Sequence, residues 1–286
     1  MTESLDPRLT PARPHVADLR LRDRVAAARY VAGTPRRVTS PSAPLRRAPA
    51  ADAALDTEAL LGDAVDLYDT ADGFAFVQLA RDGYVGYLPA ESLGPADPEP
   101  THRVTALRTF LYPEPDLKRP VLGHLSLGAR LAATGEAGAY LETPGGYVFA
   151  RHCAPVDARE PDYAATAARL AGTPYLWGGR TSLGLDCSGL VQLCLDAAGL
   201  PCPRDADMQE RALGQALTFD PARPEVAGLR RGDFVFWRGH VGLMVDPETL
   251  IHANGHHMAV AAEPLAGAVA RIAAHSFGAV TGIRRL

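Results

Sequence analysis

The residue types that could carry chemistry gather around one cysteine. Cys187 directly follows Asp186, after a glycine-rich stretch, and it begins an apolar segment with helical spacing, CSGLVQLCLDAAGL. At the start of a helix, unpaired backbone N–H groups and the helix dipole favour an anion, which lowers the pKa of a thiol and populates the nucleophilic thiolate. A buried thiol in a helix-capping sequence is the alternative interpretation of the same residues. The whole setting indicates a reactive cysteine.

A thiolate catalyst needs a base that can take up a proton and return it to a leaving amine, and histidine suits this near neutral pH. Of the nine histidines, His240 and His252 lie in strand-like segments separated by a turn, DPET. If the loop has an odd number of residues, both histidines fall on the same face of a hairpin. His252 could then orient His240 as the third group of a triad. Either histidine alone would more often be a satisfied core residue.

The pattern of apolar, polar and turn-forming residues along the chain indicates how these residues are positioned. Residues 1–35 contain one amphipathic stretch, which predicts a helix ending near Gly33 that packs on the body of the protein. A divergent repeat follows, with short alternating segments broken by Gly, Pro and Asp, and it predicts two small all-β barrels over residues 36–97 and 100–155. In the first of them, FAFVQLA and GYVGYLP are expected to form a hairpin around RDG.

Residues 157–286 have a different pattern. Two helical segments come first, and strand-like runs follow them, including GDFVFW, HVGLMV and LIHA. This order predicts an α+β domain in which the cysteine lies at a helix start and the histidines lie in a sheet.

Composition narrows the functional classes. The chain has 286 residues and a net charge of −4, so no strong basic field indicates nucleic acid as a partner. No apolar run is long enough to span a membrane, and the N-terminus has no apolar core of a secretion signal, so we expect a cytoplasmic protein. The spacing of the four cysteines matches no zinc pattern, and free thiols are expected.

Five motifs, PYLWGG, DCSGLVQ, RGDFVFW, HVGLMV and IHA, occur in an order and spacing that resemble the NlpC/P60 family of papain-like cysteine peptidases. The resemblance covers about residues 160–286 and implies a papain-like α+β fold. It implies that Cys187 is the nucleophile, that His240 is the base and that His252 is the third member of the triad. It also implies that Tyr175 lies near the oxyanion, where a phenol O–H could donate a hydrogen bond.

The two β-rich segments resemble bacterial SH3 domains. The full arrangement is similar to the NlpC/P60 subgroup that cleaves γ-D-glutamyl–diamino acid bonds in murein tripeptides and tetrapeptides with a free N-terminal L-alanine. The resemblance implies a role in cell-wall peptide recycling, a first SH3 domain that narrows the site, and no metal or organic cofactor. The diamino acid, lysine or diaminopimelate, stays open.

Four residues match positions that bind the substrate amine in that subgroup. Asp186 and Ser188 match the flanks of the nucleophile, and a carboxylate beside hydroxyl acceptors suits an ammonium group. Asp63, in LLGD, resembles a glutamate of the family but is one methylene shorter. Tyr84 resembles an amine-binding tyrosine, with Tyr87 as the alternative.

Two other functions compete with the peptidase. The same papain-like fold could serve an acyltransferase or amidase, for which a wide, lipid-lined site would be expected. The chain could also be a non-enzymatic SH3 wall-binding module with a decayed peptidase domain. The intact set of one cysteine and two histidines argues against the second alternative.

Overall fold

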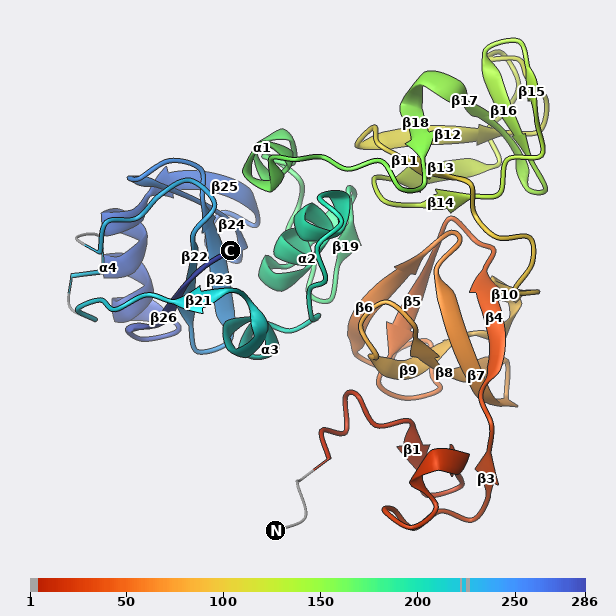
Figure 1. The fold of residues 1–286 in the computed structure, drawn as a ribbon, viewed down its shortest axis with the longest axis horizontal. Helices are drawn as coiled ribbons and strands as arrows, with labels where there is room; N and C mark the ends of the chain where they lie inside the picture. The colour runs from red at the N-terminus through yellow and green to blue at the C-terminus, as the bar shows by residue number, and fades with distance from the viewer. Residues whose placement is uncertain (1–4, 222, 225–226) are drawn as a thin grey trace. The chain divides into compact units, whose positions relative to one another are not determined.

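A computed structural model describes residues 5–221, 223–224 and 227–286 (Figure 1). The chain divides into two units, Met1–Asp157 and Ala158–Leu286. The first unit is built from strands and short 3-10 turns, and the second combines helices with one larger sheet. No helix of the described residues has both the length and the apolar character needed to cross a lipid bilayer.

The N-terminal segment is not the helix that its amphipathic pattern predicted. It forms a small sheet with the order β1-β2-β3, and its strands are Ala12–Arg13, Val16–Asp18 and Tyr30–Val31. A 3-10 turn, Leu19–Leu21, is the helical element that follows β2.

Tertiary contacts explain why the helix prediction for this segment was wrong. The backbone N–H of Ala17 donates to the Arg29 carbonyl at 3.0 Å, and that of Asp18 donates to the Pro11 carbonyl at 2.9 Å. A helix cannot make these long-range bonds. Val16 packs with Phe76 and other buried residues of the barrel, so the segment lies on the body of its unit as expected.

Residues 34–94 form one antiparallel sheet with the order β10-β4-β7-β8-β9-β5-β6. Its strands are β4 (Thr34–Val38), β5 (Ser42–Arg46), β6 (Leu55–Leu60), β7 (Ala64–Ala71), β8 (Phe74–Leu79), β9 (Val85–Pro89) and β10 (Leu93–Gly94), with a 3-10 turn at Ala90–Ser92. The predicted hairpin around RDG is confirmed, since β8 and β9 pair antiparallel with Val77 opposite Gly86.

Residues 102–155 form two further sheets, with the orders β14-β11-β18 and β13-β12-β17-β16-β15. The strands are β11 (His102–Val104), β12 (Arg108–Tyr112), β13 (Gly123–Ser126), β14 (Arg130–Leu131), β15 (Gly135–Ala137), β16 (Tyr140–Thr143), β17 (Gly146–Phe149) and β18 (Cys153–Pro155), with a 3-10 turn at Ala150–His152. Leu60 of β6 packs into the core of this region with Leu125 and Val148. The two β-rich regions therefore share apolar contacts within one unit, and a second SH3-like domain stays a prediction.

The second unit begins with helices and continues with the strands of its main sheet, as predicted, but a further helix precedes the last strand. Its elements are α1 (Tyr163–Arg169), β19 (Arg180–Thr181), β20 (Gly184–Leu185), α2 (Cys187–Ala197), α3 (Ala206–Ala212), β21 (Gln215–Ala216), β22 (Phe234–Trp237), β23 (His240–Met244), β24 (Thr249–Asn254), β25 (Ala259–Pro264), α4 (Leu265–His275) and β26 (Val280–Arg285). The main sheet is antiparallel with the order β21-β26-β22-β23-β24-β25. The sequence reasoning did not predict α4.

Two helices pack against this sheet from opposite sides (Figure 1). Helix α4 buries Leu265, Ala268 and Ile272 against apolar residues of the sheet, including Val235 and Leu250. Helix α2 contacts β23 and β24, and every residue of it except Asp196 is buried. A helix that is buried on nearly all sides lies in the interior of its domain, so α2 is the central helix of this unit and Cys187 lies at its first position.

Candidate active site

Cys187 begins α2, as predicted. The preceding residue, Asp186, is the N-cap, and its side chain accepts a hydrogen bond of 2.7 Å from the Gly189 N–H. The glycine-rich loop packs tightly here, because a Cβ added at Gly189 would lie 2.2 Å from the carbonyl oxygen of Gly179. These contacts hold the thiol at a fixed place, with 8% of the cysteine exposed.

The electrostatics of the thiol differ from the sequence-based expectation. The pKa of Cys187 is raised to about 12, mainly by burial and also by the nearby charge of Asp186. Two backbone N–H groups lower the pKa, that of Ser188 at the helix start, as predicted, and that of Val241 on β23, but desolvation outweighs them. In the substrate-free site Cys187 is therefore a neutral thiol, and a base must take its proton.

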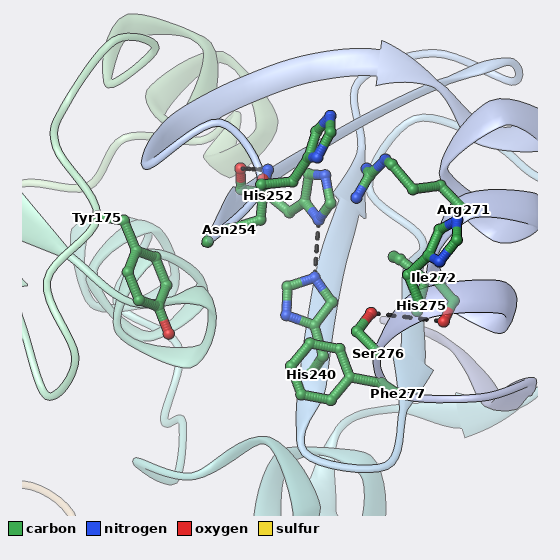
Figure 2. Close-up of a pocket in the computed structure, with 11 residues that line it drawn as sticks. Tyr175, His240, His252, Asn254, Arg271, Ile272, His275, Ser276 and Phe277 are labelled. Carbon is green, nitrogen blue, oxygen red and sulfur yellow. Dashed lines mark hydrogen bonds between the residues drawn. The ribbon is translucent and has the colours of Figure 1, made fainter.

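His240 and His252 lie on neighbouring strands. Leu243 pairs with Ile251 across β23 and β24, and this register places His252 opposite Gly242, so the two histidines share one face as diagonal neighbours. Nε2 of His240 lies 2.7 Å from Nδ1 of His252. The predicted proximity is confirmed, and Nδ1 of His240 faces the side of the pocket where Tyr175 lies (Figure 2).

A carboxylate that sequence reasoning missed extends this pair. Nε2 of His252 lies 2.7 Å from Oε1 of Glu263, and the guanidinium of Arg271 donates to the same oxygen. We call His240, His252 and Glu263 the histidine relay. Glu263 pairs with Leu250 across β24 and β25, so it is a diagonal neighbour of His252. Knowledge of this strand register would have been needed to predict the contact.

Both histidines of the relay are held neutral by burial. Burial lowers the pKa of His240 to about 3, and it also lowers the pKa of His252. The ring of Phe277 stacks on His240 with the centroids 5.1 Å apart and an angle of 3° between the planes. The ring of Trp237 lies 5.7 Å away on β22. These contacts fix the plane of the imidazole.

A cavity of about 570 Å³ opens beside the relay. Its lining includes Tyr175, His240, His252, Arg271 and Phe277, as Figure 2 shows. Burial raises the pKa of the Tyr175 phenol, and the charges that Cys187 and Asp186 can carry act in the same direction. The phenol therefore keeps its proton and can donate a hydrogen bond within the site.

The carboxylate of Asp186 accepts more hydrogen bonds than the sequence predicted. Its carboxylate accepts hydrogen bonds from the N–H groups of Gly178 and Gly189, and from the Ser188 hydroxyl. It also accepts two bonds from Arg204, at 2.9 and 2.6 Å. We call Asp186, Ser188 and Arg204 the carboxylate centre. Five donors occupy the lone pairs of Asp186, so direct contact with a substrate amine requires one donor to leave.

The other predicted amine ligands lie in the first unit. Asp63 is buried, accepts a hydrogen bond of 2.8 Å from the Leu60 N–H, and pairs with Arg81 at 2.6 Å. Tyr84 and Tyr87 are both buried there, and the Tyr87 ring packs 5.2 Å from that of Phe76. Asp63 is therefore a buried carboxylate with an arginine partner. Amine contacts for Asp63 and Tyr84 stay predictions.

Two segments of the chain match known protein families. Residues 172–275 match the NlpC/P60 family, and residues 45–93 match the family described as bacterial dipeptidyl-peptidase Sh3 domain. The first match contains Cys187, His240, His252 and Glu263.

Three relatives have informative names. The chain is 25% identical over 244 residues to the gamma-D-glutamyl-L-lysine dipeptidyl-peptidase of Bacillus cereus, which covers 74% of this chain and 71% of the relative. It is 33% identical over 123 residues to dipeptidyl-peptidase 6 of Lysinibacillus sphaericus, covering 43% and 42%. It is 35% identical over 100 residues to the gamma-D-glutamyl-L-lysine dipeptidyl-peptidase of Bacillus subtilis, covering 32% and 31%. The matches span less than half the length of the last two relatives.

Solved structures support the fold. An NlpC/P60 family protein from Bacillus cereus aligns with a TM-score of 0.71 at 22% identity, covering 88% of this chain and 99% of that one. An NlpC/P60 endopeptidase from Photobacterium damselae subsp. piscicida aligns with a TM-score of 0.60 at 15% identity, covering 88% and 71%. At these identities the likeness shows the fold alone. The chain therefore contains a bacterial SH3 domain followed by a domain of the NlpC/P60 family with its papain-like α+β fold.

Proposed function

We propose that this protein is a cysteine peptidase that hydrolyses the γ-D-glutamyl–diamino acid bond of short murein peptides with a free N-terminal L-alanine. The observation that carries the proposal is the 2.7 Å contact between His240 and His252, in a domain whose central helix begins at Cys187. The names of the relatives from Bacillus supply the substrate class.

The first half-reaction forms a thioester. Nδ1 of His240 accepts the thiol proton as the sulfur of Cys187 attacks the γ-carbonyl carbon, whose oxygen takes up the negative charge. The phenol O–H of Tyr175 donates to this oxyanion. When the tetrahedral intermediate collapses, the imidazolium of His240 gives its proton to the nitrogen of the leaving diamino acid. The C–N bond breaks and L-Ala-γ-D-Glu stays bound through the sulfur.

The second half-reaction restores the enzyme. His240 removes a proton from water, which attacks the thioester carbon, and the thiolate leaves with the proton that His240 had taken up. The products are L-Ala-γ-D-Glu, the diamino acid portion and the original thiol. Every proton moves through His240, and one water molecule is consumed.

Recognition of the free amine is the second part of the proposal. The carboxylate of Asp186 offers negative charge close to Cys187, and Ser188 lies beside it. Because Arg204 already neutralises this carboxylate, the amine gains little from Asp186 unless Arg204 moves. Asp63 and Tyr84 of the SH3 domain are proposed as further contacts to the amine.

A peptide assay tests both parts. Purified protein is incubated with L-Ala-γ-D-Glu-diaminopimelate and L-Ala-γ-D-Glu-L-Lys, each with a free and with an acetylated N-terminus, and products are followed by mass spectrometry. We expect release of L-Ala-γ-D-Glu from the free peptides. Acetylation should slow release, because it removes the ammonium charge and adds bulk where the amine is proposed to bind.

Two results would count against this function. Equal digestion of free and acetylated peptides, or of intact sacculi, would remove the amine requirement and indicate a wall-remodelling hydrolase. Transfer of the dipeptide to an added amine, without hydrolysis, would indicate the acyltransferase alternative. A cytoplasmic role in peptide recycling is part of the proposal, and fractionation of cells that express the full chain tests it.

A further inference from the structure

The chain of hydrogen bonds at His240 continues past the pair of histidines. His240 contacts His252, His252 contacts Glu263, and the carboxylate of Glu263 is held by Arg271. His252 is fully buried and the side chain of Glu263 is 15% exposed. Water therefore has little access to the middle of this relay, and the positions of its protons are set by the protein groups themselves.

When both histidines are neutral, the protons along the relay can be assigned to the ring nitrogens in only one way. A carboxylate can only accept hydrogen bonds, so Nε2 of His252 must carry the proton in its contact with Glu263. Nδ1 of a neutral His252 is then an acceptor, and the proton in the contact with His240 belongs to Nε2 of His240. The remaining nitrogen, Nδ1 of His240, is left with a free lone pair.

We propose that Glu263 is a positioning residue that sets the tautomers of His252 and His240, so that Nδ1 of His240 can accept the thiol proton. The inference rests on the proposed roles of Cys187 and His240. With the opposite tautomer, Nδ1 of His240 would already hold a proton and could not act as a base. Glu263 thereby acts through two histidines on a reaction that it does not touch.

Neighbouring groups keep the side chain of Glu263 ionised. The hydrogen bond from His252 is the largest influence that lowers the pKa of Glu263, and the charges of Arg271 and His257 lower it further. The charged and titratable groups that face His252 are His240 from β23, Glu263 from β25, Arg271 from α4 and His257 from the loop after β24. Glu263 therefore stays a carboxylate, which is the form that can only accept.

A purely structural role is the competing explanation, in which Glu263 and Arg271 only join β25 to α4. Nitrogen-15 NMR of histidine-labelled protein separates the two. The His252 signals are assigned by their loss in H252N. We expect a protonated Nε2 and an unprotonated Nδ1 for His252 in the wild-type protein. The reverse tautomer would overturn the proposal, and this spectrum requires no variant of Glu263.

Three variants extend the test. E263A removes the acceptor and should populate both tautomers of His252. E263Q keeps an oxygen that Arg271 and His252 can both bond, so it should keep the wild-type tautomer without the charge. E248Q changes an exposed carboxylate in the turn between β23 and β24 and serves as the matched control. An unchanged tautomer in E263A, or a reversed one in E263Q, would contradict the proposal.

Reactivity supplies the functional readout. We expect E263A to lower kcat by about 10- to 100-fold, as when a carboxylate that orients a metal-bound histidine is removed, with KM changed by less than about threefold. E263Q should lose less, and E248Q nothing. Alkylation of Cys187 by iodoacetamide should slow in the same order. Because NMR and alkylation need no peptide, a failure of the murein assay alone would count against the proposed function and leave Glu263 testable.

Discussion

Two buried polar centres in the same domain differ in how the cost of burying their polar groups is offset. In the carboxylate centre, Asp186 and Arg204 are an ion pair, and every lone pair of the carboxylate has a donor. In the histidine relay, two neutral rings share single hydrogen bonds of 2.7 Å, and charge begins only at Glu263. The first arrangement fixes geometry, and the second leaves protons able to move.

Because of this difference, substitutions in the two centres should have different effects. A carboxylate held by five donors contributes by holding the start of α2 and the glycine-rich loop, so its loss should lower stability. A neutral relay adds little to the free energy of unfolding, because each hydrogen bond that it makes in the folded protein replaces one that the ring makes with water. Its loss should lower activity and leave the fold intact.

The largest expected effect comes from the thiol that lies near both centres. C187S changes one atom, so the fold should persist, but a serine hydroxyl at this site is a far weaker nucleophile. Removal of a nucleophile in other hydrolases costs about a millionfold in kcat, which sets the scale. Hydrolysis of the free tripeptide should become undetectable, with circular dichroism unchanged. Activity within tenfold of the wild type would exclude the thioester mechanism.

Within the relay, the base should matter more than the residue that orients it. H240A should lower kcat by roughly four decades or more, and H252A by less, since His240 carries the proton in both half-reactions. The double variant should be little worse than H240A because the two act as a unit. Tripeptide kinetics of the three variants provide the measurement; losses that simply multiply would show that the histidines work independently.

The centres also differ in how visible they are in the sequence. Cys187 and the histidines stand in local motifs, and strand alternation predicted that His240 and His252 share a face if the loop between them has an odd number of residues. Arg204 and Glu263 contact the site from segments with no motif of their own, because sheet register and loop packing bring them there. For the same reason the apolar spacing of residues 16–33 indicated a helix, while long-range backbone bonds and a neighbouring sheet selected short strands.

Damage to the carboxylate centre should appear as lost stability. D186A removes the carboxylate that pairs with the guanidinium of Arg204, which is 1% exposed. Breaking a buried pair in this way costs about 3–5 kcal/mol, and loss of the N-cap adds about 1 kcal/mol. D207A, which breaks the exposed pair between Asp207 and Arg211, is the control and should cost less than about 1 kcal/mol.

Urea unfolding followed by tryptophan fluorescence measures this difference in one unit of the chain. The protein has two tryptophans, Trp177 and Trp237, and both lie in the second unit. The fluorescence transition therefore reports on the NlpC/P60 domain and not on the β-rich unit. Equal midpoints for D186A and D207A would show that the carboxylate centre does not stabilise this domain.

The smallest effect concerns how the stability of the domain depends on pH. Burial lowers the pKa of His240 to about 3 in the folded protein, whereas an unfolded histidine titrates near 6.5. Below pH 6.5 the unfolded chain therefore binds a proton that the folded domain does not. The stabilisation is complete above pH 6.5 and is lost as the pH falls toward 3, with a slope of about 1.4 kcal/mol per pH unit for one such histidine.

H240N isolates this contribution, because asparagine cannot titrate and the other histidines are unchanged. Between pH 6.5 and 5.0 the wild-type domain should lose about 2 kcal/mol more stability than H240N, in urea unfolding followed by tryptophan fluorescence. H256N, which changes an exposed histidine, should follow the wild type. If H240N and the wild type lose stability in parallel, the relay takes up its proton in the folded domain as easily as in water. The neutral relay would then differ less from the carboxylate centre than its burial indicates.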